Sequence, residues 1–459
     1  MYDVIVIGAG VGGYTAAIKS AKAGMKTAII ETAEFGGTCL NRGCIPTKYL
    51  VSEAHNYCNL QKKLLEQIYV GEISFDYIKV IENLEKKVAT LTNGIQWLLQ
   101  KNDVDIYCGT AEFIDPDHIM IHETNELLEV RKVIIASGSS PQRMSVYGNE
   151  QDVEKHIYTT DNIFYNLKNV PNSIAIVGGG AVGLELAFIY SGLGSDVTII
   201  EQRDGFLNEV DHDIEAELMR MFSDKKIRVI TRCHIDSIFC EPSSVTVIDD
   251  NEDEVTNTEV LLFAMGRKAN IEKLRLNKAN IVTKDGVICT DSNYRTSNQN
   301  VYAVGDVNGK KTLAYAASAQ AENAVADICG MSIKKDEEVM PVCLFLDLEI
   351  AYVGVLEREA KKKNIHVKTA KYLMSSNGRS RTDDNGGFMK IVTDKDTGVV
   401  LGGICVCSMA SELISYITVA IESKMTISQL IKTVFPHPTY SESLIEAAEL
   451  IGGECIYMM

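Results

Sequence analysis

The stretch VIVIGAGVGGYTAAIKSAKAGMKTAIIE, at Val4–Glu31, recurs later in the chain as IAIVGGGAVGLELAFIYSGLGSDVTIIE, at Ile174–Glu201. The two copies align without a gap at an offset of 170, and eight positions are identical. Each copy begins with a short apolar run typical of a buried parallel strand. The pattern G-x-G-x-x-G follows, then an apolar-periodic helix, a second strand and a terminal glutamate. The repeat therefore predicts two βαβ units of the same kind.

This unit has the physical requirements of a dinucleotide-binding turn. The first glycine permits a tight turn, the second lets backbone approach a pyrophosphate, and the third lets helix and strand pack closely. The pyrophosphate lies at the helix N-terminus, where free N–H groups and the helix dipole favour an anion. The terminal glutamate accepts hydrogen bonds from a ribose diol. The candidate residues are Gly8, Gly10, Gly13 and Glu31 in the first unit, and Gly178, Gly180, Gly183 and Glu201 in the second.

The second unit favours NAD over NADP, because a carboxylate at Glu201 would repel a 2′-phosphate. Arg203 is the one residue that would instead favour NADP, and we expect it to face solvent. An electron-transfer enzyme with two dinucleotides usually pairs a flavin with a nicotinamide. A close cysteine pair follows the first unit, so we expect FAD in the first domain and NAD in the second.

That cysteine pair lies in GGTCLNRGCIPTK, at Gly36–Lys48. It allows three interpretations: half of a metal site, a structural disulfide or a redox dithiol. A metal site needs further ligands, yet the closest histidine is His55 and no second pair follows. A redox dithiol fits best, because Cys39 and Cys44 can close a small ring. The run after Pro46 is predicted to start a helix, whose dipole would favour the Cys44 thiolate.

Composition narrows the class of protein further. The chain of 459 residues has room for about two to four domains. Its formal net charge of −17 argues against nucleic acid or an anionic membrane as a partner. The twelve cysteines are scattered, and we recognise no signal peptide, so we expect a reducing compartment, the cytoplasm. Cys405 and Cys407 are predicted to be buried.

A candidate base lies near the end of the chain, in HPTYSE. A dithiol must lose a proton before it attacks a disulfide, and histidine titrates near neutral pH. His437 is therefore the candidate base. Thr439 and Glu442 also have the spacing of a helix-starting capping box, which can coexist with a catalytic role for His437.

Together these motifs resemble the pyridine nucleotide–disulfide oxidoreductases. TSNQNVYAVGD, at Thr296–Asp306, and HPTYSESLIEAAE, at His437–Glu449, complete the pattern across the chain. The resemblance implies an α/β fold with two Rossmann-like dinucleotide-binding domains, for FAD and NAD, plus a C-terminal α+β dimerisation domain. The expected domains are FAD-binding (1–145), NAD-binding (146–265), a second FAD-binding or central part (266–340) and the interface domain (341–459). Residues 50–100 are expected to be mainly helical, and helices are expected at Ser411–Glu422 and roughly Ser441–Ile451.

The resemblance also assigns roles to single residues. Cys44 would face the flavin, Cys39 would exchange with substrate, and Glu442 would orient His437. Lys48 would lie near the flavin, paired with Glu185. Further expected FAD contacts are Ala111, Gly138, Asp306 and Ala314, and Gly266 and Arg267 are expected against the second dinucleotide.

The implied activity is oxidation of protein-bound dihydrolipoamide to lipoamide, with reduction of NAD⁺. The implied assembly is a homodimer whose active sites are shared between chains, served by a lipoylated protein of a 2-oxo acid dehydrogenase or glycine cleavage system. The alternatives are another NAD(P)H-dependent disulfide reductase of the same family, or a mainly structural subunit. The chain departs from the family pattern at Leu346–Leu348, Tyr315, Ala269 and Phe435.

Overall fold

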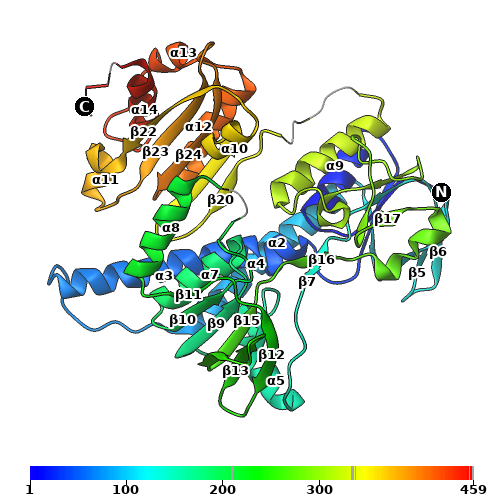
Figure 1. The fold of residues 1–459 in the computed structure, drawn as a ribbon. Coiled ribbons are helices and arrows are strands. Elements are labelled where there is room, and N and C mark those ends of the chain that lie inside the picture. The colour runs from blue at the N-terminus through cyan, green and yellow to red at the C-terminus, as the bar shows by residue number, and fades with distance from the viewer. Residues whose placement is uncertain (208–209, 332–334, 336–337, 454, 457–459) are drawn as a thin grey trace.

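The computed structural model describes residues 1–459 except 208–209, 332–334, 336–337, 454 and 457–459. Figure 1 shows three lobes, each built on a sheet: one holds the N-terminus, one lies beside the long helix α3 (Cys44–Leu65), and one holds the C-terminus.

The first lobe contains the first repeat unit. Its sheet has the order β3-β2-β1-β6-β5-β4, and β19 also pairs with β6. The pairs β1–β2, β1–β6, β2–β3 and β19–β6 are parallel, whereas β4 and β5 extend the sheet antiparallel. The strands are β1 (Tyr2–Ile7), β2 (Thr27–Glu31), β3 (Asp105–Cys108), β4 (Ala111–Asp115), β5 (His118–Ile121), β6 (Glu126–Ile135) and β19 (Val301–Ala303).

Helices of the first lobe connect these strands. α1 packs against α9, and α3 and α4 fill most of residues 44–101, as the sequence predicts. The helices are α1 (Val11–Lys22), α2 (Gly37–Asn41), α4 (Tyr77–Lys101) and α9 (Ala314–Ile328). Short 3₁₀ turns lie at Glu272–Leu274, Leu276–Ala279 and Gly305–Asn308, and a small hairpin is formed by β17 (Thr283–Lys284) and β18 (Val287–Ile288).

The second lobe contains the second repeat unit in a parallel sheet of order β11-β10-β9-β15-β8. Its strands are β8 (Ile157–Thr159), β9 (Ser173–Val177), β10 (Asp196–Ile200), β11 (Arg228–Ile230) and β15 (Val260–Phe263). An antiparallel meander follows, with β12 (Ile235–Cys240), β13 (Val245–Asp249) and β14 (Glu254–Thr258). The helices are α5 (Glu150–His156), α6 (Ile163–Asn166), α7 (Ala181–Gly192) and α8 (His212–Asp224).

The chain leaves the first lobe through β7 (Ser139–Pro141) and returns through β16 (Arg267–Ala269). These two strands pair antiparallel, so both crossings lie side by side.

The third lobe is an antiparallel sheet of order β20-β21-β24-β23-β22. Its strands are β20 (Val342–Leu344), β21 (Glu349–Gly354), β22 (Val367–Leu373), β23 (Phe388–Asp394) and β24 (Val400–Cys407). The helices are α10 (Glu357–Lys362), α11 (Gly378–Thr382), α12 (Ala410–Glu422), α13 (Ile427–Ile431) and α14 (Glu442–Gly452), with a 3₁₀ turn at Met374–Ser376. The two helices expected near the C-terminus are thus confirmed to within one residue at each end, and Cys405 and Cys407 are buried as predicted.

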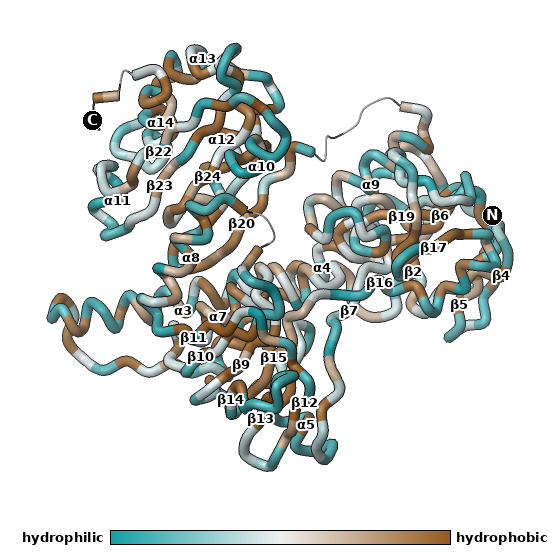
Figure 2. Tube along the Cα trace, in the orientation of Figure 1, coloured by the Kyte–Doolittle hydropathy of each residue, from teal (hydrophilic) through white to brown (hydrophobic). Residues whose placement is uncertain are grey.

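The apolar core does not stop at the lobe boundaries. Figure 2 shows apolar residues running along central strands such as β9 and β15. One cluster joins Leu50 of α3, Ile199 of β10 and Phe388 of β23, so all three lobes pack on one another. The predicted fold class, two Rossmann-like domains with a C-terminal α+β domain, is confirmed. Among the described residues, none of the helices combines the length and hydropathy that a membrane span requires.

Candidate active site

The two glycine-rich turns have the same geometry. Gly8 and Gly178 have φ values of +99° and +114°, in the left-handed region that favours glycine. A Cβ on Gly13 would lie 1.8 Å from the Gly8 carbonyl oxygen, and one on Gly183 would lie 2.0 Å from the Gly178 oxygen. Both helices can therefore approach their strands only because the third glycine has no side chain.

The middle glycine of each turn leaves room for a ligand. A Cβ on Gly180 would meet nothing within 4 Å, and one on Gly10 would meet only the Gly37 Cα at 3.9 Å. α1 and α7 begin directly after these glycines, and neither helix has an acidic residue in its first turn. Free N–H groups at an uncapped helix start attract a phosphate. Both turns thus fit a dinucleotide pyrophosphate.

Glu31 ends β2 beside the first turn. Its Oε2 accepts the Ala9 N–H at 2.6 Å, and its Oε1 accepts the Ala33 N–H at 2.8 Å. These backbone donors fix the carboxylate at the carboxyl edge of the parallel sheet, where dinucleotides bind in folds of this kind.

Glu201 repeats this arrangement in the second lobe. Its Oε2 accepts the Gly179 N–H at 2.7 Å, and its Oε1 accepts the Arg203 N–H at 2.9 Å. The Arg203 guanidinium adds a bond from Nε to Oε1 at 3.0 Å. Although burial favours a higher pKa for Glu201, the hydrogen bonds from Arg203 and Gly179 lower that pKa. Arg203 is exposed to solvent, as expected, and its guanidinium also folds back onto Glu201.

Other predicted contact positions gather at the carboxyl edge of the first sheet. Gly138 follows β6 with φ +67°, and Asp306 follows β19 and accepts a short hydrogen bond from the Ser139 hydroxyl. Ala314 is the first residue of α9, whose N-cap residue Leu313 makes no side-chain cap hydrogen bond. Ala111 is buried at the start of β4. The parallel register of β6 and β19 explains why Gly138 and Asp306, distant in sequence, share one edge.

Gly266 and Arg267 lie where the chain returns from the second lobe. Gly266 has φ +100°. The Arg267 guanidinium donates to Ser139 Oγ at 2.8 Å, to Asp161 Oδ1 at 2.7 Å and to Thr38 Oγ1 at 3.3 Å. In this structure its donors are thus directed toward the crossing strands and the cysteine loop. Nothing in the sequence signalled Asp161 and Ser139 as partners of Arg267.

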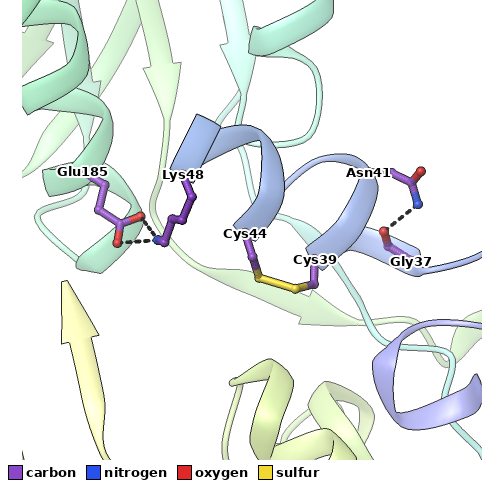
Figure 3. The surroundings of a disulfide bond; sticks show 6 residues. All are labelled: Gly37, Cys39, Asn41, Cys44, Lys48 and Glu185. Carbon is purple, nitrogen blue, oxygen red and sulfur yellow. Dashed lines mark hydrogen bonds and ion pairs between the residues drawn. A yellow bond between two sulfur atoms is a disulfide. The ribbon is translucent and has the colours of Figure 1, made fainter. Parts of the chain in front are cut away.

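Cys39 and Cys44 form a disulfide between α2 and α3 (Figure 3). Both residues are partly exposed. α3 begins at Cys44 itself, three residues before the start that was predicted after Pro46, so the sulfur lies at the helix N-terminus. A Cβ on Gly37 would lie 2.7 Å from the Gly10 Cα, which means that α2 packs directly against the first dinucleotide turn. The disulfide and the first glycine-rich turn are therefore neighbours.

One helical turn after Cys44, Lys48 reaches across to α7. Its Nζ lies 2.9 Å and 3.0 Å from the two Glu185 carboxylate oxygens, as Figure 3 shows. The Glu185 side chain is only 7% exposed. Burial raises the pKa of Glu185, and Lys48 opposes that rise. The structure therefore brings this predicted pair together.

Phe345, between β20 and β21, completes this group. Its N–H donates to Glu185 Oε1 at 3.1 Å, and the Lys48 Nζ lies 3.8 Å from its ring centroid. The third lobe thereby contributes to a site built by the other two. The sequence contained no local signal for this contact, because it depends on how the lobes pack.

His437 and Glu442 also lie together. The ring Nδ1 is 2.7 Å from Glu442 Oε1, and Glu442 Oε2 accepts the Thr439 N–H at 2.8 Å. This bond from the Thr439 N–H to Glu442 is one half of the predicted capping box. The other half does not form, because the Thr439 hydroxyl donates to the Pro436 carbonyl and α14 begins only at Glu442. Figure 1 shows α14, the helix that follows His437 in the chain, far from α2.

The departures from the family pattern have local structural partners. The Tyr315 hydroxyl donates to the Pro341 carbonyl. Leu346 and Leu348 are buried, and Asp347 between them pairs with Lys225 at 2.7 Å. Ala269 pairs with Ser139 in β16–β7, and the Phe435 ring packs on Tyr416 with centroids 5.9 Å apart.

Comparison with known proteins places this geometry in a family. Residues 2–321 match the family described as pyridine nucleotide-disulphide oxidoreductase, and residues 340–448 match its dimerisation domain. Among curated proteins, dihydrolipoyl dehydrogenase of Bacillus subtilis is 32% identical, covering 100% of this chain and 98% of that protein. Dihydrolipoyl dehydrogenase of Chlamydia muridarum is 34% identical, covering 100% of this chain and 98% of that protein. The enzyme of the same name from Geobacillus stearothermophilus is 33% identical, covering 100% of this chain and 97% of that protein.

Solved structures agree. The flavoprotein disulfide reductase RclA from Escherichia coli, 26% identical, superposes with a TM-score of 0.88 over 98% of this chain and 100% of that one. LpdA from Mycobacterium tuberculosis, 25% identical, superposes with a TM-score of 0.90 over 98% of this chain and 99% of that one. These matches bear out the predicted enzyme class, an oxidoreductase with FAD and NAD as cofactors and a redox disulfide. By sequence and by fold, the chain belongs to the pyridine nucleotide-disulphide oxidoreductase family.

Proposed function

We propose that this enzyme oxidises protein-bound dihydrolipoamide to lipoamide and reduces NAD⁺ to NADH. The observation that carries the proposal is the Cys39–Cys44 disulfide at the start of α3, packed against the first dinucleotide turn and one helical turn from Lys48 and Glu185. The curated relatives named dihydrolipoyl dehydrogenase, matched over the whole chain, support the choice of substrate.

FAD is assigned to the domain of residues 1–145 and 266–340, and NAD to residues 146–265. The open turn at Gly10, the edge position of Asp306 and the start of α9 at Ala314 support the first assignment. The equivalent turn at Gly180, with Glu201 fixed beside it, supports the second.

The dithiol half-reaction begins with proton transfer. His437 of the partner subunit takes a proton from one substrate thiol, while Glu442 holds the opposite ring nitrogen. The substrate thiolate then attacks Cys39, and the Cys39–Cys44 bond breaks with its electron pair on Cys44. The dipole of α3 stabilises the Cys44 thiolate at its N-terminus.

The second substrate thiol then displaces Cys39 and its proton passes to the leaving Cys39 sulfur, so that lipoamide leaves with a new disulfide and the cysteine pair is reduced. FAD held at the first glycine-rich turn would supply the acceptor for the electron pair on Cys44 and the route to NAD⁺, while Cys39 loses its proton and bonds again to Cys44, which restores the disulfide. Lys48, paired with Glu185 and stacked on Phe345, holds a positive charge beside Cys44 on the same helix. The overall reaction converts dihydrolipoamide and NAD⁺ to lipoamide, NADH and a proton.

The proposed assembly is a homodimer in which each disulfide meets the base of the other chain. The matched dimerisation domain and the distance between α14 and α2 in one chain support this arrangement. The electron donor would be a lipoylated protein of a 2-oxo acid dehydrogenase or glycine cleavage system. Ten of the twelve cysteines are free, which supports a reducing compartment, the cytoplasm.

The test is NADH formation from dihydrolipoamide and NAD⁺ by the purified FAD-loaded protein. Cys44→Ser is expected to abolish turnover while the protein still binds FAD, because no disulfide remains to accept the substrate electrons. Absence of the reaction in the wild-type protein, or full turnover by the serine variant, would contradict the proposal. Reduction of other disulfides by NADH, without dihydrolipoamide oxidation, would instead favour a disulfide reductase, the description printed for RclA.

A further inference from the structure

The two repeat units differ at one position beside the ribose-binding carboxylate. At the offset of 170, Arg203 occupies the place of Ala33. Both residues give their backbone N–H to the glutamate, at 2.8 Å for Ala33 and 2.9 Å for Arg203. Only Arg203 adds a cationic side chain. The second nucleotide site thus carries a charge that the first site lacks at that position.

The guanidinium of Arg203 offsets the charge of Glu201. Its Nε and Nη2 lie 3.0 Å and 3.4 Å from the two carboxylate oxygens. The Glu201 side chain is 6% exposed, whereas that of Arg203 is 44% exposed, so the arginine lies on the solvent side of the pair. A carboxylate discriminates against NADP because it repels the 2′-phosphate, and an arginine nearby accommodates that phosphate. This site has both groups in contact.

The Arg203 guanidinium is not the sole hydrogen-bond donor to the Glu201 carboxylate. Its oxygens also accept the backbone N–H groups of Gly179 and Arg203, at 2.7 Å and 2.9 Å. If the Arg203 side chain turned outward to a phosphate, these donors would remain. The carboxylate would therefore keep two hydrogen bonds when the side chain moved, which lowers the cost of that movement.

A second arginine lies next to Arg203. The Arg232 N–H donates to the Arg203 carbonyl at 2.9 Å, which fixes the two backbones side by side. The Arg232 guanidinium pairs with Asp204, and both side chains are at least 70% exposed. Exposed ion pairs contribute little and exchange readily with solvent. Two arginines therefore border the edge where Glu201 would hold the ribose diol, balanced by two carboxylates.

We propose that Arg203 lets the second nucleotide site accept the 2′-phosphorylated dinucleotide NADP(H) in addition to NAD(H). The inference rests on the proposed assignment of the second site to a nicotinamide dinucleotide. With the ribose 2′-hydroxyl free, Glu201 is the acceptor. With a 2′-phosphate, the Arg203 guanidinium turns from Glu201 to the phosphate, and Arg232 adds a second positive charge nearby.

The test uses two adenosine fragments that need no turnover. The FAD-loaded enzyme, whose first site is occupied, is titrated by calorimetry with 5′-AMP and with adenosine 2′,5′-bisphosphate. The wild-type protein is expected to bind both. Arg203→Ala should weaken the bisphosphate by roughly tenfold to a hundredfold, the loss expected for a charge-assisted hydrogen bond, and change 5′-AMP affinity by less than about threefold.

Arg220→Ala is the matched control. Arg220 is also an exposed, ion-paired arginine of the second lobe, but it lies on α8 and pairs with Glu217 and Asp224. Its removal should leave both affinities unchanged. Catalysis should follow binding, with the ratio of kcat/KM for NADP⁺ to that for NAD⁺ falling in Arg203→Ala alone.

The inference is overturned if the wild-type protein binds 5′-AMP but not the bisphosphate. It is also overturned if Arg203→Ala weakens the binding of both fragments by the same factor. If neither fragment binds, the assignment of the second site to a dinucleotide fails, and the inference fails with it.

Discussion

At the residue scale, the site depends on a group that joins all three lobes. Lys48 comes from α3, Glu185 from α7 and Phe345 from the β20–β21 connection. The buried carboxylate holds the ammonium from one side, and the aromatic ring lies 3.8 Å from it on another. An ammonium confined in this way loses less freedom when a ligand binds than a solvated lysine does.

Replacing Phe345 tests this arrangement. Phe345→Leu removes the ring but keeps the N–H that binds Glu185. A cation–π contact of this kind contributes roughly 0.5–2 kcal/mol, so reduction of bound FAD by dihydrolipoamide should slow about twofold to thirtyfold in stopped-flow measurements. Phe345→Tyr keeps the ring and should retain the wild-type rate. Equal rates for the leucine and tyrosine variants would show that the ring does not position Lys48.

At the element scale, the glycine-rich turn decides whether strand, turn and helix can close around a nucleotide. The third glycine is the critical position, because its Cα approaches the first glycine's carbonyl oxygen. Gly94, in the middle of α4, has the opposite environment: a Cβ there would meet nothing within 4 Å.

This contrast gives a matched pair of variants. Gly183→Ala would place a Cβ 2.0 Å from the Gly178 oxygen, so the turn must shift. We expect a loss of roughly 1–3 kcal/mol in the free energy of unfolding and loss of 5′-AMP binding to the FAD-loaded protein. Gly94→Ala should instead be neutral or stabilise the protein by up to about 1 kcal/mol. Urea denaturation with calorimetry measures both, and normal nucleotide binding by Gly183→Ala would contradict the assigned role.

The same contrast explains what could be predicted from the sequence. The repeat, the strand-turn-helix order and the glycine spacing are local patterns, so both βαβ units followed from them, whereas the C-terminal dimerisation domain followed from the family resemblance. The Lys48–Glu185 and His437–Glu442 pairs followed from the family resemblance. Phe345 and the partners of Arg267 could not be predicted, because their contacts arise from packing between lobes. Arg203 is exposed as expected, but the local pattern did not show that its side chain folds back onto Glu201.

At the scale of the whole molecule, one buried cation joins the second and third lobes. Lys390 of β23 has a side chain only 5% exposed, and its Nζ lies 3.1 Å from Asp211, 2.6 Å from Asp213 and 2.8 Å from Glu357. Burial favours a lower pKa for Lys390, but the hydrogen bonds to Asp213 and Glu357 raise it, so the ammonium stays charged at neutral pH. This junction anchors the start of α8 to the third lobe and so holds the second nucleotide domain in place.

Removing the Lys390 cation should lower the free energy of unfolding, by an amount that depends on pH. Lys390→Met leaves the buried Asp211 carboxylate without its lysine partner and removes one of the cations that face Asp213 and Glu357. Breaking a buried ion pair in this way typically costs about 3–5 kcal/mol near neutral pH. Lys371 pairs with Asp213 at 2.7 Å but is 41% exposed, so Lys371→Met, the matched control, should cost at most about 1 kcal/mol.

The pH dependence follows from the carboxylates that face Lys390. Burial opposes ionisation of Asp213, yet the hydrogen bonds from Lys371 and Lys390 lower its pKa, and the hydrogen bonds from Lys390 and Lys361 lower that of Glu357. Carboxylates with lowered pKa values stabilise the folded protein above their unfolded pKa values of about 4, and that contribution disappears as the pH falls through the folded values. The stability difference between wild type and Lys390→Met in urea denaturation should therefore be largest near neutral pH and shrink below about pH 4. A difference that stays constant across this range would show that Lys390 acts by packing and not by charge.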